Sequence, residues 1–153
     1  MKVSLAQIAG QAEKALSGHE NVAAAANGCA WLEACGYPGI KLLLEALGDV
    51  RQNAVLQPDA MGLDLQNVSC VFLGGTIDAY VKAHGRVFLR NVRHGLYLLP
   101  LSVAANIGIG CPIDPGFALG GERSKNPYRE KLDMAARDGV TVDDDLWHAL
   151  EAK

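Results

Sequence analysis

Residues 106–121, NIGIGCPIDPGFALGG, form the stretch of the chain richest in residue types that could do chemistry, with five glycines, two prolines and one cysteine. Gly108 and Gly110 match the first half of a G-x-G-x-x-G dinucleotide loop, but the sixth position is Ile113, where glycine or alanine is needed. Pro112 has no N–H to donate to a phosphate. A turn-rich connection is therefore favoured over a phosphate-binding loop.

Cys111 lies inside this stretch and is the candidate catalytic nucleophile. A cysteine becomes a nucleophile when a cation, a base or a helix N-terminus stabilises its thiolate. His84 and His94 are candidate bases, but neither stands at a recognisable catalytic spacing from Cys111. The Cys-Pro and Asp-Pro-Gly sequences suit an extended segment that enters a tight turn, so a structural turn is the favoured interpretation.

A basic segment precedes the glycine-rich stretch and contains Arg86, Phe88, Arg90 and Arg93. If RVFLR is a strand, Arg86, Phe88 and Arg90 share one face. Guanidinium groups bind carboxylates and phosphates in a bidentate manner, and an aromatic ring stacks on planar groups. These four residues are the predicted ligand-binding residues. In the plainer interpretation, which the sequence favours, the arginines lie on a solvated strand face and pair with the acidic residues 143–145.

Composition narrows the class of protein. The 153 residues include 14 Lys and Arg against 17 Asp and Glu, a net charge of −3 that gives no basis for binding nucleic acid. The N-terminus lacks the apolar core of a signal peptide, and no apolar run approaches the roughly 20 residues of a membrane span. We expect one cytoplasmic domain over residues 1–153, with no membrane partner.

The potential metal ligands are scattered. No C-x-x-C pair occurs, so the four cysteines are interpreted as free thiols in a reducing compartment: Cys29, Cys35, Cys70 and Cys111. The histidines form no H-x-x-x-H pair on a helix, so no metal site is predicted. No cofactor can be named from the sequence.

The first 50 residues are predicted to be helical. Ser4 and Gln7 match a capping box at the start of one helix, and Gly18 is placed to end it. A second helix is expected over residues 21–35, with Gly36 as its left-handed C-terminal residue, and a third over IKLLLEALG.

Residues 66–110 are predicted to be mainly β. NVSCVFL is rich in β-branched and aromatic residues and ends at Gly74-Gly75, a turn signal, and RVFLRNV alternates as a strand does. Residues 76–85 and 95–106 fit either a strand or a helix.

Two helices are expected in residues 126–152, the first with Asn126 as cap and Gly139 at its end, the second started by Asp143 to Asp145. The predicted fold is α+β: an N-terminal three-helix region packed on a small antiparallel sheet, followed by the C-terminal helices. An exposed Trp147 on the last helix would favour a homodimer contact.

The segments VSLAQIAGQAEKAL, WLEACGYPGIKLLLEAL, LQNVSCVFLG, RNVRHGLYLLP and VDDDLWHALEAK occur in an order that resembles a proteobacterial family of unknown function. This resemblance covers most of the chain and its motifs are mainly hydrophobic; it implies no catalytic residue, because none is established for the family. Two functions remain. The favoured one is an accessory protein that binds a partner protein or a small anionic metabolite. The alternative is a small enzyme, or a subunit of one, that uses His94 or Cys111 beside the glycine-rich stretch.

Overall fold

Three helices form the N-terminal part of the protein, as the sequence predicts. The computed structural model describes residues 1–85, 87–105, 109–110 and 128–153. Helix α1 spans Leu5–Ala15, α2 spans Val22–Ala34 and α3 spans Gly39–Leu47. The capping box is confirmed, because Ser4 Oγ accepts from Gln7 N at 3.1 Å and Gln7 Oε1 accepts from Ser4 N at 2.8 Å.

Helices α2 and α3 meet at a tight reversal. Gly36 has the predicted left-handed backbone, with φ of 83°. Pro38 precedes α3 and gives it no side-chain cap, and the Glu33 carboxylate instead accepts from Ile40 N at 2.7 Å. Gly39 lies against α2 so closely that an added Cβ would be 2.6 Å from the Cys29 carbonyl oxygen. The crossing of these helices therefore requires glycine at this position.

Residues 66–110 are mainly helical, so the prediction of a mainly β region is wrong. The apolar run that we interpreted as a strand opens helix α4 (Cys70–His84), and Ser69 caps it by accepting from Val71 N at 3.2 Å. A short run of apolar residues fits a buried helix as well as a strand. Gly74 and Gly75 make no turn; an added Cβ at either glycine would lie about 3 Å from the Asn21 carboxamide, which packs against them.

Strand β4 (Val87–Arg90) forms where the alternation predicts it, but the sheet is mixed rather than antiparallel. The strand order is β2-β3-β4-β5. Strands β2 (Pro58–Asp59) and β3 (Gly62–Asp64) form an antiparallel hairpin, whereas β4 pairs in parallel with both β3 and β5 (Ile109–Gly110). The parallel pairs follow from the connections: α4 links β3 to β4, and 3₁₀ helix η1 (Gly95–Tyr97) with α5 (Leu98–Ala105) links β4 to β5.

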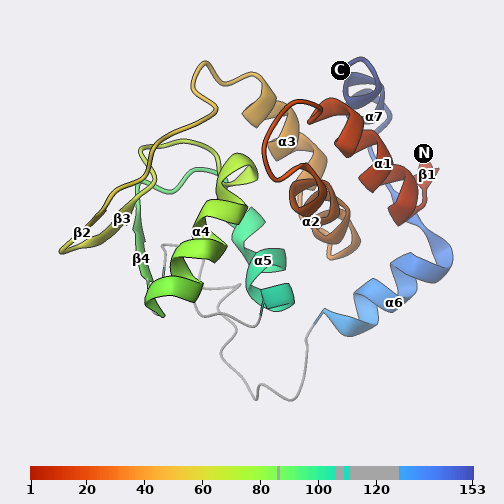
Figure 1. Cartoon of the computed structure of the whole chain (residues 1–153). Coiled ribbons are helices and arrows are strands. Elements are labelled where there is room, and N and C mark those ends of the chain that lie inside the picture. The colour runs from red at the N-terminus through yellow and green to blue at the C-terminus, as the bar shows by residue number, and fades with distance from the viewer. Residues whose placement is uncertain (86, 106–108, 111–127) are drawn as a thin grey trace.

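The protein is therefore α+β, as predicted, with its layers in a different order. Helix α4 lies against one face of the sheet, and α5 lies between α4 and the N-terminal helices (Figure 1). The three-helix region thus packs on α4 and α5 rather than directly on the sheet. Leu63, Val87 and Leu89 point from the sheet into this core and are buried. In the part of the chain that the structure describes, no helix covers the opposite face.

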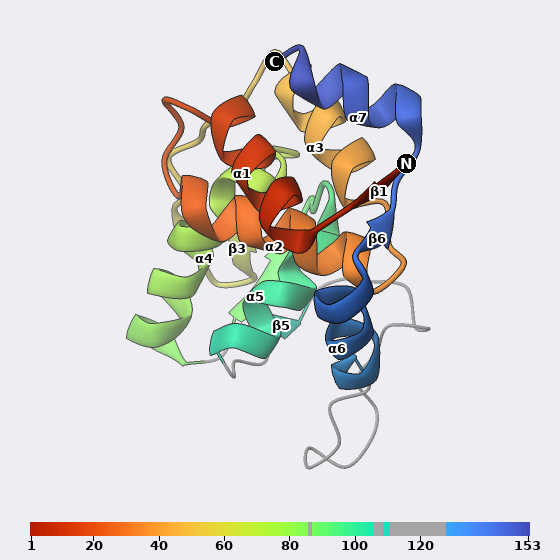
Figure 2. The ribbon, with the colours of Figure 1, turned by 90° about the vertical axis from the view of Figure 1, so that its right-hand side faces the viewer.

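The two ends of the chain lie together. Strand β1 (Lys2–Val3) pairs antiparallel with β6 (Val140–Thr141), between α6 (Arg129–Asp138) and α7 (Asp144–Glu151) (Figure 2). The Met1 ammonium contacts Asp144 Oδ1 at 2.8 Å. Asp143 caps α7 by accepting from Leu146 N at 3.0 Å, as predicted from the clustered aspartates.

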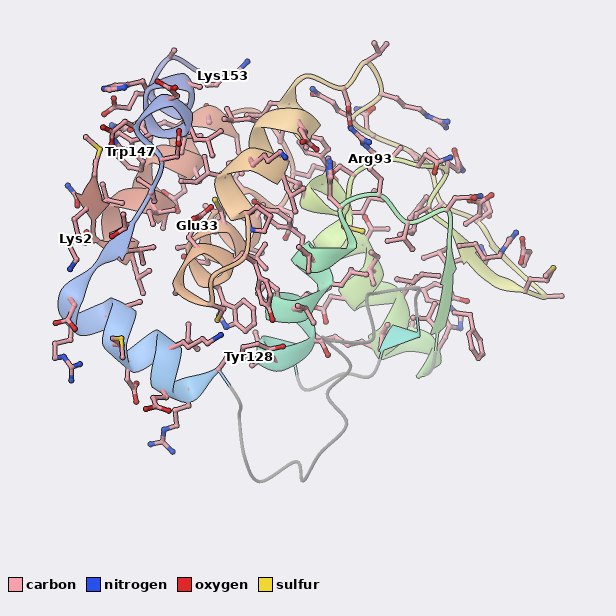
Figure 3. The ribbon with its side chains drawn as sticks, turned by 180° about the vertical axis from the view of Figure 1, so that it is seen from behind. Lys2, Glu33, Arg93, Tyr128, Trp147 and Lys153 are labelled. Carbon is pink, nitrogen blue, oxygen red and sulfur yellow. The ribbon has the colours of Figure 1, made fainter. Side chains whose placement is uncertain are left out.

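The aromatic side chains near the C-terminus lie in the core. Trp147 is buried, so it provides no dimer contact on the surface (Figure 3). Tyr128, before α6, is buried against Trp31 with ring centroids 4.7 Å apart. No helix within the described ranges is long and apolar enough to span a membrane.

Candidate functional site

Two loops meet at the carboxyl edge of the parallel strands. Residues 65–69 follow β3 and residues 91–94 follow β4, and parallel strands place both loops at the same edge. Backbone hydrogen bonds join them beyond the strands: Asn67 N donates to Asn91 O at 3.1 Å, and Cys70 N donates to Arg93 O at 2.9 Å. We call these two loops the carboxyl-edge loops.

The backbone of the carboxyl-edge loops is unusual. Five non-glycine residues within the described ranges have positive φ, and four of them lie here: Gln66 (56°), Asn67 (60°), Asn91 (53°) and His94 (56°). A left-handed conformation costs an ordinary L-residue roughly 1–2 kcal/mol, less for Asn. Such residues persist where the surroundings hold them, and they concentrate at binding and active sites. The concentration at one edge therefore marks a candidate functional site.

Asp64 holds the two loops in this conformation. Its Oδ1 accepts from Asn91 Nδ2 and from Gln66 N, each at 2.8 Å. These two hydrogen bonds lower the pKa of Asp64 below its usual range, and the Arg90 guanidinium acts in the same direction. The carboxylate is thus ionised at neutral pH and ties the end of β3 to the loop after β4.

Two arginines line a depression beside these loops. Arg93 forms a bidentate pair with Asp49, which follows α3: its Nε and Nη2 donate to the two carboxylate oxygens at 2.8 Å each. Arg93 lies beside the C-terminal end of α3 (Figure 3). The open depression is lined by Asp49, Val50, Arg51, Asn67 and Arg93. Within the described ranges Arg51 forms no ion pair, and its guanidinium contacts the Gln66 side-chain oxygen.

His94 joins three segments through its ring. Its Nδ1 lies 2.7 Å from Ser69 Oγ, and its Nε2 lies 3.2 Å from Glu45 Oε2, on α3. Since the Glu45 carboxylate accepts from Nε2, Nδ1 accepts from the Ser69 hydroxyl. The result is a chain of hydrogen bonds from serine to histidine to carboxylate, which are the residue types of a hydrolase triad.

Three observations argue against Ser69 as a nucleophile. The residue has 0% exposed surface, so no substrate carbonyl can reach its hydroxyl. Its Oγ also accepts from Val71 N, as a helix cap does. The next amide, Cys70 N, donates to Arg93 O and is not available to stabilise an oxyanion. The arrangement therefore supports the loops and does not activate a nucleophile.

The charge state of His94 agrees with a structural role. Burial and the neighbouring Arg93 guanidinium lower its pKa below the usual range, against the opposing effect of Glu45. The neutral ring predominates at physiological pH, and it accepts from Ser69 while it donates to Glu45.

The structure separates the predicted ligand-binding residues. Phe88 and Arg90 lie on the outer face of β4, and Arg93 lies at the carboxyl edge. Arg86 lies outside the described residues. Arg90 pairs with Asp59 of β2 and Arg93 with Asp49, so the predicted pairing of the arginines with residues 143–145 is wrong for both. Residues 143–145 lie away from both arginines, because the helix that they begin, α7, packs on α1 and α3.

Two of the described cysteines, Cys29 and Cys35, are unreactive thiols. Cys111 lies outside the described residues, so its role as a nucleophile stays a prediction. Burial raises the pKa of Cys29 to about 12 and that of Cys35 to about 11, so neither is a thiolate at neutral pH. No group of three or more metal-ligating side chains occurs within the described ranges.

Sequence reasoning missed Arg51, Asp64 and Asn67, which line or support the site. It also missed three residues that contact the loop after β4, which are Glu45, Asp49 and Ser69. They lie 49, 44 and 25 residues away from their partners in the loop after β4. No local pattern connects residues at such separations. One available signal was Ser69 itself, since a serine before an apolar run is typical of a helix N-cap.

No protein-family model, curated protein or solved structure matches this chain. The resemblance to a proteobacterial family of unknown function therefore stays a prediction.

Proposed function

We propose that this protein is a non-enzymatic binding protein that takes a small anionic ligand, a carboxylate or a phosphate, at the carboxyl edge of its parallel strands. The observation that carries the proposal is the pair of guanidinium groups, Arg51 and Arg93, on one open depression beside the carboxyl-edge loops. Held rigidly, guanidinium groups bind such anions through two parallel hydrogen bonds.

Each arginine keeps donors for a ligand. Asp49 engages Nε and Nη2 of Arg93, and within the described ranges nothing engages the N–H groups of Nη1. Arg51 contacts an amide oxygen rather than a carboxylate, so an anion adds the charge partner that this residue lacks within the described ranges. Asn67 lines the same depression. Arg90, on the outer face, is not part of this site.

The proposal also includes the cellular compartment of the protein. Cys29 and Cys35 are buried thiols, which is consistent with a reducing cytoplasm. We propose that the protein acts there on a small-molecule ligand.

The test is thermal unfolding of wild-type protein with citrate, succinate, inorganic phosphate and a sugar phosphate, each matched for ionic strength with sodium chloride. A ligand present at about a hundred times its Kd stabilises by about 2.7 kcal/mol. For a domain of this size that is a rise in Tm of roughly 5–10 °C.

Arg51→Gln should abolish the rise in Tm. Arg137→Gln is the matched control, because Arg137 is an exposed arginine on α6 that pairs only with the adjacent Asp138 within the described ranges. The proposal is wrong if none of the four anions raises the Tm, or if both variants lose the rise equally.

A further inference from the structure

The depression that holds the two arginines of the proposed site carries little net charge. Its lining contains the guanidinium groups of Arg51 and Arg93 and one carboxylate, that of Asp49. Asp49 already pairs with Arg93 through two hydrogen bonds of 2.8 Å. Arg51 is thus the one cation of this lining that forms no ion pair within the described ranges. The lining offers a ligand a single uncompensated positive charge.

Two further carboxylates lie within electrostatic range of these arginines. Beyond its pair with Asp49, Arg93 has its pKa raised by Glu45. Beyond its own hydrogen bonds, Asp64 has its pKa lowered by Arg51. A phosphate monoester carries roughly two negative charges at neutral pH, and these acidic groups repel both of them. A single carboxylate therefore matches the charge of the depression better than a phosphate does.

Val50 adds an apolar surface to the same depression. It stands between Asp49 and Arg51 in the sequence, lines the depression with them, and has an exposed fraction of 106%, so no described side chain covers it. An apolar group of a ligand that covers this valine leaves water together with it, which favours binding. The best ligand therefore has an apolar group beside its charged group.

The size of the depression suits a small molecule. Its volume is about 400 Å³, which lies within the usual range of small-molecule sites. From these observations we infer that the ligand is a small monocarboxylic acid with an apolar group, such as a short aliphatic acid. Its carboxylate binds Arg51 with Arg93 beside it, and its apolar group covers Val50. The inference rests on the proposed function and names the class of its ligand.

An NMR titration of ¹⁵N-labelled wild-type protein tests the inference, because chemical shifts measure weak dissociation constants. The ligands are acetate, butyrate, hexanoate and inorganic phosphate, each matched for ionic strength with sodium chloride. Complete burial of a valine side chain changes a binding constant by about ten- to hundredfold. Hexanoate, which covers one side of Val50, should bind about tenfold more tightly than acetate, with butyrate between them. Phosphate should bind more weakly than hexanoate.

Two valine variants separate the apolar contact from the charge. Val50→Ser should leave the dissociation constant of acetate unchanged and reduce the advantage of hexanoate to about twofold. Val55→Ser is the matched control, because Val55 belongs to the same segment and is 81% exposed but is not among the lining residues in the described part of the chain. This control should keep the tenfold advantage. Both side chains are exposed, so both variants should fold, and their ¹⁵N spectra check this.

Three results would overturn the inference. The first is equal binding of acetate and hexanoate by wild-type protein, and the second is tighter binding of phosphate than of hexanoate. The third is an advantage of hexanoate that Val50→Ser and Val55→Ser change equally.

The same titrations distinguish this inference from the proposed function. If carboxylates bind without preference for hexanoate and Arg51→Gln abolishes their binding, the anion site stands and the inference alone fails. If neither the carboxylates nor phosphate shift the signals of Arg51 and Asn67, both fail.

Discussion

Replacement of Ser69 by alanine tests whether the hydrogen bonds that join Ser69, His94 and Glu45 stabilise the fold. The substitution removes the N-cap of α4, which typically costs about 1 kcal/mol. It also leaves Nδ1 of His94 without its partner. The His94 side chain is only 5% exposed, so a buried polar atom is left unsatisfied, at a cost of about 1–3 kcal/mol. The expected total loss in the free energy of unfolding is about 2–4 kcal/mol.

Ser4→Ala provides the matched control. Ser4 also caps a helix, α1, but it lies at the surface, and within the described ranges its side chain accepts from Gln7 N alone. This variant should lose about 1 kcal/mol, the value of the cap alone. Equilibrium unfolding in urea measures both variants, with the m-value as a check that two-state behaviour is kept. The difference between the two losses estimates the contribution of the bond to His94.

A double variant makes the test sharper. Once Ser69 is alanine, His94→Asn should cost less than it does in wild-type protein, because the hydrogen bond that it would break is already absent. The expected coupling is about 0.5–3 kcal/mol, the range for residues in direct contact. Equal losses in Ser69→Ala and Ser4→Ala, together with additive effects in the double variant, would refute the reasoning.

Two further predictions concern packing and pH. Gly39→Ala places a Cβ 2.6 Å from the Cys29 carbonyl oxygen and should lower the free energy of unfolding by about 1–3 kcal/mol. Gly10→Ala, in α1 with nothing within 4 Å of the new Cβ, should raise it by about 0.5–1 kcal/mol, and urea unfolding of both variants checks the pair. The lowered pKa of His94 means that the unfolded state binds more protons below pH 6.5, so stability should fall as the pH drops through this value. Urea unfolding as a function of pH should show a weaker dependence in His94→Asn, and an NMR titration that places His94 at or above 6.5 would contradict the prediction.

Local sequence patterns predict the helical N-terminal part of the fold. The capping box of Ser4 and Gln7 and the left-handed Gly36 each act within a few residues, so they can be recognised without knowledge of the fold. The alternation of Val87, Phe88 and Leu89 also has its effect locally, because successive side chains of a strand point to opposite faces.

The same local reasoning failed where a pattern fits two structures. The apolar run that begins at Cys70 suits a buried helix or a buried strand, and the core around it selected the helix. Gly74 and Gly75 read as a turn, yet their lack of a side chain makes room for Asn21, which belongs to a segment some fifty residues earlier. The helix at Cys70 and the packing of Gly74 and Gly75 on Asn21 therefore depend on residues that are distant in the sequence.

The chain by itself therefore determined where most helices begin and end and which side of β4 is apolar, because these properties depend on backbone preferences and on short periodicities. Only the tertiary structure decided that β3, β4 and β5 run in parallel and that their carboxyl-edge loops meet. It also decided that Arg93 pairs with Asp49, and His94 with Ser69 and Glu45. These partners are distant in the sequence, so their pairing depends on how the helices between them cross and pack.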